Sequence, residues 1–199
     1  MNRKILIASN NQGKLRELTA LLNGLKLDLL TPDELGVNLN VPENGTTYEE
    51  NALIKARAFC LASGLPSLAD DTGLEVDALN GAPGLHSARF VPQPGAKDSD
   101  RRRLLLARLQ DKPQPWKARF VCAVVLAIPD ERIFSTFGQC EGEIIKNERG
   151  ESGFGYDRVF LFPSLGKTMA ELSMLEKNEI SHRAKAVQAI IPHILELMG

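Results

Sequence analysis

Two adjacent acidic residues, Asp70 and Asp71, follow a short apolar run at 65–69. Neighbouring carboxylates repel each other unless one is protonated or a cation lies between them. Carboxylate oxygens are also the ligands that Mg²⁺ prefers, and Glu43 in an earlier loop can supply another. The pattern predicts a magnesium site, although an exposed acidic turn fits it equally well.

A second candidate is the segment SNNQGK at 9–14, between an apolar run and a leucine-spaced helix. Backbone amides at a helix start, together with Lys14, can bind a phosphate group. The spacing of a P-loop is missing, because Leu15 stands where its hydroxyl residue should be. Lys55 follows Asn51 by one helical turn, so both side chains can point the same way. A tight turn and an ordinary polar helix face are the alternatives.

The segment SGFGYDRVF at 152–160 places Phe154 between two glycines and ahead of Tyr156 and Asp157. Glycines let a chain approach a flat ligand closely, an aromatic ring can stack on that ligand, and a carboxylate can accept hydrogen bonds from its edge. A β-bulge over the core explains the same pattern.

The segment SHRAK breaks a local rule. If Ser181 is an N-cap, His182 and Arg183 lie in the first helical turn, where positive charge opposes the macrodipole. Residues that conflict with a local structural preference in this way often have a functional role.

Two enzyme classes are disfavoured. A Ser-His-Asp hydrolase is one of them, because the chain has no nucleophile elbow. An aspartic protease needs two Asp-Thr-Gly loops, or a dimer, to share a proton between two carboxylates. It is disfavoured here because Asp70 adds a third charge next to the Asp-Thr-Gly at 71–73 and the chain has too many helical segments. Lysines, carboxylates, an aromatic ring and a His-Arg pair together fit a nucleoside polyphosphate.

The elements that must position these residues follow from apolar periodicity and turn signals. The expected strands are at 4–8, 65–69 and 74–79, with a polar corner at 70–73, and the expected long hairpin joins 117–128 to 132–137 and 142–145. The expected helices begin near Leu15, at Thr47 with a capping box to Glu50, at Asp98 and at Ser181, the last one containing Pro192. This order predicts an α/β fold with a mixed β-sheet, a long central hairpin and helices packed around it.

Composition excludes several classes of protein. The net charge of −1 argues against nonspecific nucleic-acid binding. We expect no membrane span and no signal peptide, and therefore a cytoplasmic protein. The cysteines Cys60, Cys122 and Cys140 form no CxxC pair, so we expect small buried residues rather than disulfides or a zinc ribbon.

In its whole set of motifs the chain resembles the inosine triphosphate pyrophosphatase family, also called Ham1-like. The resemblance runs through nearly the full length in order: ASNNQGKLREL, ENALIKAR, LADDTGLEVDALNGAPGLHSARF, ARFVCAVVL, GFGYDRVF, GKTMAEL and EKNEISHRAKA. It implies one domain over 1–199, with two lobes flanking an active-site cleft. It also implies Mg²⁺-dependent hydrolysis of inosine, deoxyinosine and xanthosine triphosphates to the monophosphate and pyrophosphate, by a homodimer.

The resemblance also implies roles for individual residues. The triphosphate would be held by Ser9, Asn10, Asn11, Gln12, Gly13, Lys14, Lys55 and Lys177, and Mg²⁺ by Glu43 and Asp71. Thr72, Gly155 and Tyr156 would contact the substrate, and the base would be bound by Phe154, Asp157, His182 and Arg183. Within these sets Asp71 would also activate water, Phe154 would stack on the base, and the last three residues would read its edge. The chain departs from the family at Asn10, Thr72 and Arg158, where Gly, Ser and Pro are frequent.

Hydrogen-bond polarity would make such an enzyme select inosine over adenosine triphosphate. Hypoxanthine carries a 6-keto acceptor where adenine carries a donor, so donors from His182 or Arg183 would be left unpaired by ATP, and such sites reject the wrong partner by roughly 10⁴-fold. Two other functions remain open from the sequence: a house-cleaning pyrophosphatase for modified pyrimidine triphosphates, and a module that binds nucleotides without hydrolysis.

Overall fold

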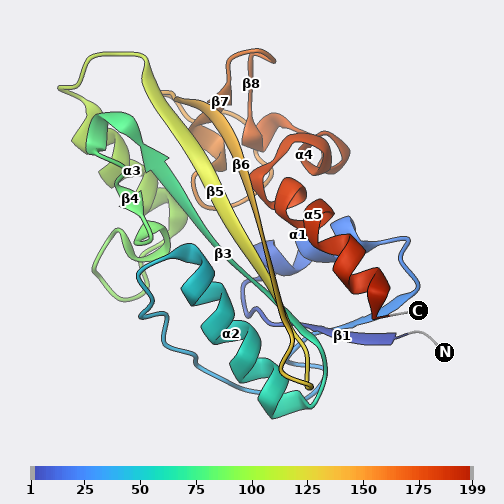
Figure 1. Ribbon diagram of the computed structural model, residues 1–199. Helices are drawn as coiled ribbons and strands as arrows, with labels where there is room; N and C mark the ends of the chain where they lie inside the picture. Colours follow the sequence, from blue (N-terminus) through green and yellow to red (C-terminus); the bar gives the residue numbers. More distant parts are fainter. Residues whose placement is uncertain (1–2, 198–199) are drawn as a thin grey trace. The chain divides into compact units, whose positions relative to one another are not determined.

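The computed structural model describes residues 3–197, which form two compact units. Unit 1 takes its described residues from 3–71, 122–138 and 181–197, and unit 2 consists of 72–121 and 139–180. Strands β3 (Ser67–Val76), β5 (Trp116–Ala127) and β6 (Ile133–Ile144) supply residues to both units. Figure 1 shows the order of the elements along the chain.

Unit 1 is a sheet covered by helices on both faces. Its strand order is β2-β1-β3-β5-β6, in which β1 (Arg3–Ile7) pairs in parallel with β2 (Leu27–Leu30) and with β3. Because strand side chains alternate, Ile5 and Ile7 pack with α1 (Gln12–Leu22) and α5 (His182–Glu196). Leu6 and Ala8 point the other way and pack with α2 (Tyr48–Ser63).

The helix termini of unit 1 agree with the predicted caps. The Thr47 side chain accepts a hydrogen bond from the Glu50 amide at the start of α2, and Gly64 ends that helix in the left-handed region at φ 67°. The Ser181 hydroxyl caps α5 through the Ala184 amide. Helix α1 begins at Gln12, earlier than predicted, because the Asn11 side chain caps it.

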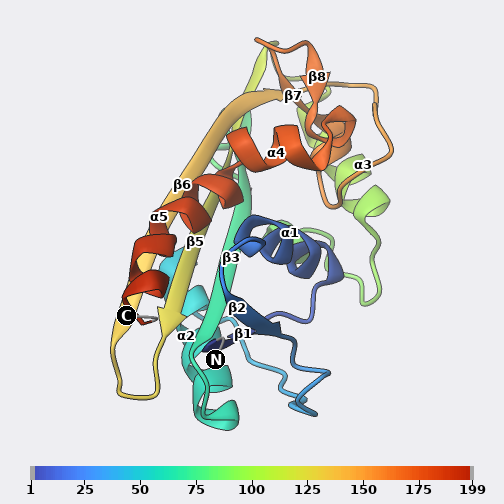
Figure 2. The same ribbon diagram turned by 90° about the vertical axis from the view of Figure 1, so that its right-hand side faces the viewer.

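Helix α5 lies alongside β6 in unit 1, as Figure 2 shows, and Gly138 permits this packing. A Cβ atom at that position would lie 2.2 Å from the His182 carbonyl oxygen and 2.5 Å from the Ala186 nitrogen. This close approach fixes the first turn of α5, which carries the SHRAK motif.

Unit 2 contains the remaining elements. Its strand order is β4-β3-β5-β6-β7-β8, with β4 at Pro83–Gly84, β7 at Phe160–Phe162 and β8 at Lys167–Thr168. Helices α3 (Asp98–Leu109) and α4 (Met174–Ile180) accompany four short 3-10 turns, at Asp77–Leu79, Ser87–Arg89, Asp157–Val159 and Met169–Glu171. The apolar core of this unit includes Leu105, Leu109, Trp116 and Phe160.

The predictions of a mixed α/β fold and of a long hairpin, formed by β5 and β6, are confirmed, whereas the prediction of a polar corner at 70–73 is wrong. Strand β3 continues through this polar segment without a break. Among residues 3–197, no helix has the length and apolar character that crossing a membrane requires. All three cysteines are free and buried, as predicted.

Candidate active site

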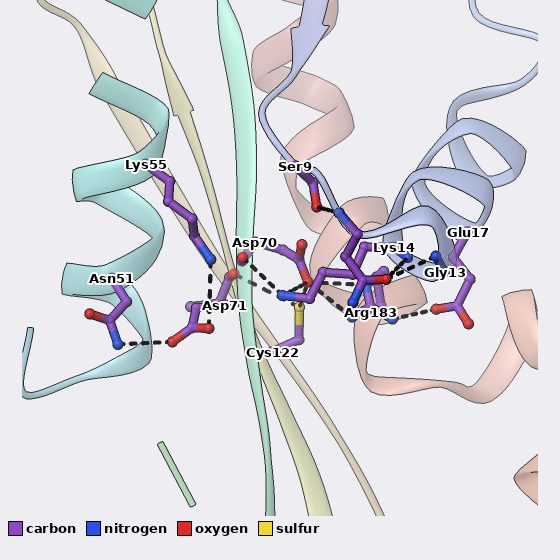
Figure 3. Close-up of polar contacts among 12 residues, drawn as sticks. Ser9, Gly13, Lys14, Glu17, Asn51, Lys55, Asp70, Asp71, Cys122 and Arg183 are labelled. Atoms are coloured by element: carbon purple, nitrogen blue, oxygen red, sulfur yellow. Dashed lines mark hydrogen bonds and ion pairs between the residues drawn. The ribbon is translucent and has the colours of Figure 1, made fainter. Parts of the chain in front are cut away.

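Strand β3 directs its two adjacent carboxylates to opposite faces of the unit 1 sheet. Successive side chains of a strand alternate, so Asp70 points toward α1 and α5 while Asp71 points toward α2 (Figure 3). Each carboxylate therefore has different direct partners, although the charges of Lys14 and Lys55 act on both. Cations thus lie close to both carboxylates, the condition under which two neighbouring acidic residues can both be ionised.

Asp70 is the buried anchor of an ion network. Its Oδ2 lies 3.2 Å from Lys14 Nζ and accepts hydrogen bonds from Arg183 Nε at 3.1 Å and Nη2 at 2.9 Å. Arg183, only 1 % exposed, also donates through Nη1 to the Glu17 carboxylate. Burial alone would raise the pKa of Asp70, but Lys14 and Arg183 outweigh it and hold that pKa well below its usual range. The network keeps Asp70 ionised and fixes Lys14.

Asp71 has a different environment on the other face. Its Oδ2 accepts a hydrogen bond from Asn51 Nδ2 at 3.1 Å, and its Oδ1 lies 3.7 Å from Lys55 Nζ. Burial raises the pKa of Asp71, and the opposing effects of Lys55 and Lys14 do not cancel that rise. A carboxylate with a raised pKa next to charged groups is suited to act as a general base.

The Asn51 side chain links Asp71 to the loop that contains Glu43. The side chain is fully buried; its Oδ1 accepts from the Gly45 amide at 2.8 Å, while its Nδ2 donates to Asp71. Gly45 has no room for a side chain, because a Cβ there would lie 2.9 Å from that Oδ1 and 2.7 Å from Glu50 Cβ. From the sequence we predicted for Asn51 only a shared direction with Lys55, and the signal that could have revealed its role is its position next to the apolar stripe of α2.

Glu43 and Asp71 form a donor set that fits a divalent metal ion bound in part by other oxygen ligands. Lys55 Nζ lies 2.6 Å from Glu43 Oε1 and also faces Asp71, so one cation already serves both carboxylates. Within 3–197, no three His, Cys, Asp or Glu side chains gather as a complete metal site. Mg²⁺ in nucleotide enzymes is usually held by one or two carboxylates together with phosphates and water, which matches this donor set.

The segment at 9–14 forms the turn into α1 and presents several amides at the helix start. Asn11 Oδ1 accepts from the amides of Gly13 at 2.8 Å and Lys14 at 3.1 Å, and Ser9 Oγ accepts from the Asn11 amide at 3.2 Å. These acceptors are short polar side chains of the same loop. An incoming phosphate oxygen can replace them, since a helix start favours negative charge.

A second group of predicted residues lies in unit 2, around Phe154. The Phe154 amide donates to Asp157 Oδ2 at 3.0 Å, and Lys177 Nζ donates to the same oxygen at 2.8 Å. Lys177 Nζ also lies 5.5 Å from the centre of the Phe154 ring. The structure thus places Lys177 beside the aromatic residue, and its predicted contact with the triphosphate stays a prediction.

Comparison with known proteins assigns the family. The model of the Ham1 family matches residues 5–193. The chain belongs to the Ham1 family. It is 45% identical over 198 residues to the dITP/XTP pyrophosphatase of Haemophilus ducreyi, covering 96% of this chain and 98% of that relative. It is 46% identical to the dITP/XTP pyrophosphatase of Xanthomonas axonopodis pv. citri, covering 99% of both.

A solved structure gives the same assignment for the fold of the Ham1 family. The structure of a HAM1 protein from Coxiella burnetii matches with a TM-score of 0.86 and 39% identity, covering 98% of this chain and 99% of that chain. The predicted ITPase-like α/β fold class is therefore confirmed.

Three further predicted site residues of this Ham1-family chain, Thr72, Tyr156 and Arg183, lie in different surroundings. Thr72 follows Asp71 in β3 and belongs to unit 2. Tyr156 is buried, its hydroxyl donates to the Ser87 carbonyl at 2.9 Å, and burial raises its pKa, so it acts as a support for its loop. Arg183 directs Nε, Nη1 and Nη2 at Asp70 and Glu17, which does not support its predicted contact with a base.

Proposed function

We propose that this chain is a divalent-metal-dependent pyrophosphatase that converts dITP, ITP and XTP to the nucleoside monophosphate and pyrophosphate. The observation that carries the proposal is the group formed by Asp71, Glu43 and Lys55: a carboxylate of raised pKa shares a lysine with a second carboxylate. Relatives matched from end to end carry the name dITP/XTP pyrophosphatase, which agrees with this chemistry.

In the proposed reaction, Lys14, Lys55 and the amides at 9–14 bind the triphosphate. Glu43 and Asp71 would hold Mg²⁺, which would offset phosphate charge and polarise the reacting phosphorus. Asp71 accepts the proton of a water molecule that attacks the α-phosphorus, the bond from that phosphorus to the bridging oxygen breaks, and pyrophosphate leaves. Asp70 stays ionised and keeps Lys14 in place throughout.

We assign the base to unit 2. Phe154 stacks on the purine and Asp157 reads its edge. The base-reading role of His182, which lies in unit 1, stays a prediction, and Arg183 is assigned to holding Asp70 instead. A donor facing the 6-position would pair with a keto oxygen and stay unpaired against the amino group of adenine. Such a site separates inosine from adenosine triphosphates by hydrogen-bond polarity.

Three broader features belong to the same proposal. Residues 1–199 act as one catalytic domain, the metal is Mg²⁺, and the protein works as a cytoplasmic homodimer. The near-complete coverage of the relatives supports the first of these.

Product analysis tests the proposed reaction. The protein is incubated with inosine triphosphate and Mg²⁺, and the products are separated by ion-exchange chromatography. We expect equal amounts of inosine monophosphate and pyrophosphate, and no turnover after chelation of the metal. Release of inorganic phosphate with the diphosphate, turnover restricted to modified pyrimidine triphosphates, or binding without any product would each reject the proposal.

A further inference from the structure

The loop that carries Phe154 is held by two side chains of helix α3. Asp98 Oδ2 accepts a hydrogen bond from the Gly155 amide at 2.7 Å, and Arg102 Nη1 donates to the Gly155 carbonyl oxygen at 2.7 Å. Residues four apart in a helix project from the same face, so one surface of α3 binds both backbone groups of Gly155. Neither residue was a predicted site residue.

The loop needs such support because its own hydrogen bonds, between Phe154 and Asp157, fix only part of its shape. Gly153 and Gly155 flank Phe154, and both adopt positive φ, at 77° and 60°. Glycine visits many backbone conformations when it is unrestrained, so a Gly-Phe-Gly segment is free to move until other groups hold it. Contacts from outside the loop hold Gly155, and Asp98 and Arg102 supply two of them.

Arg102 is itself held rigidly. It is 7% exposed, and its Nε and Nη2 donate to the two carboxylate oxygens of Glu148 at 2.8 and 3.0 Å, while its remaining Nη1 reaches Gly155. This bidentate pair lowers the pKa of Glu148, because the Arg102 hydrogen bond favours its charged form. The guanidinium plane is therefore fixed before any ligand binds, and so is the donor that it offers to the loop.

We propose that Asp98 and Arg102 are positioning residues that hold the Phe154 loop ready for the purine base, and that they strengthen base binding without contacting the nucleotide. The inference rests on the proposed function, which assigns Phe154 to base stacking. A loop that is already ordered loses less entropy when the ligand binds. Loss of one charge-assisted hydrogen bond is expected to weaken base-dependent binding roughly ten-fold.

Two competitive inhibitors of the full-length protein separate this role from general damage. Inosine monophosphate carries the base, and inorganic tripolyphosphate carries only the phosphate chain. For Asp98→Ala we expect the inhibition constant of inosine monophosphate to rise roughly ten-fold while that of tripolyphosphate stays unchanged. Asp98→Asn should restore most of the affinity, because its amide oxygen can still accept from Gly155.

Asp100→Ala is the matched control. Asp100 lies in the same helical turn and accepts from the Lys97 amide, but it does not contact the loop. Equal inhibition constants for Asp98→Ala and Asp100→Ala, or an equal loss for both inhibitors, would overturn the inference. If Asp98→Ala does not fold, Arg102→Lys applies the same test, since a lysine cannot bind Glu148 as a fork and Gly155 together. Absence of inosine triphosphate turnover by the wild type would instead reject the proposed function.

Discussion

Asp70→Asn is expected to lower the stability of the protein, whereas Asp71→Asn is expected to abolish turnover, although the two residues are neighbours in β3. Asp70→Asn removes the charge that Lys14 and Arg183 share in a buried network. Removing one partner of a buried ion pair typically costs about 3–5 kcal/mol of unfolding free energy, because the other charge stays buried. In a protein of this size that loss lowers Tm by roughly 6–20 °C.

Asp71→Asn should spare the fold and abolish turnover. The raised pKa of Asp71 shows that its charged form is disfavoured in the folded protein, so replacing it with a neutral amide is not expected to destabilise. The amide oxygen can also still accept from Asn51. Loss of a general base typically lowers kcat by about 10²–10⁴-fold, and loss of a metal ligand adds to that.

The pair is measured by thermal unfolding and by inosine triphosphate turnover on the same preparations. We expect Asp70→Asn to be the less stable variant and Asp71→Asn to be the inactive one with a Tm close to wild type. Equal Tm values for the two variants, or wild-type turnover by Asp71→Asn, would refute the division of roles between the two faces of β3.

Three further predictions follow from the same residues. Asn51→Ala should weaken Mn²⁺ binding to the free protein, measured by electron paramagnetic resonance, by roughly ten-fold or more, and unchanged affinity would contradict its link to Asp71. Lys55→Met should tighten Mn²⁺ binding, because Lys55 competes with the metal for Glu43 and Asp71, and should lower turnover, because Lys55 is proposed to bind the triphosphate. Weaker Mn²⁺ binding would contradict this. The pKa of Asp70 is lower in the folded state than its usual value of 3.8, so the unfolded state binds the proton first as the pH falls below that value. The free energy of unfolding of the wild type should therefore fall more steeply with pH than that of Asp70→Asn, and parallel curves of unfolding free energy against pH would contradict this.

Apolar periodicity and caps were sufficient for most elements of the fold. The α3 bounds, the Gly64 stop and the Ser181 cap agree with local signals, because each depends on residues close in sequence. The β5–β6 hairpin was equally visible from its apolar runs and its short turn. The polar segment 70–73 was misread as a corner, because local patterns do not show that distant cations neutralise buried carboxylates in a strand.

The candidate site was predicted as a set of residues rather than as an arrangement. Lys14, Lys55, Glu43 and Asp71 do gather in unit 1, as their chemistry suggested. The ion network around Asp70 was not predicted, because contacts such as that of Arg183 with Glu17 join residues 166 positions apart. Such long-range pairs depend on tertiary packing, which no motif in this chain encodes locally.

The proposed hydrolysis of keto-purine nucleoside triphosphates, with rejection of adenine nucleotides, is tested by comparing kcat/KM for pyrophosphate release from dITP and from dATP at the same Mg²⁺ concentration. We expect a ratio of roughly 10⁴ in favour of dITP, the discrimination typical of a site built around one hydrogen-bond polarity. A ratio near one, or faster release from dATP, would contradict it.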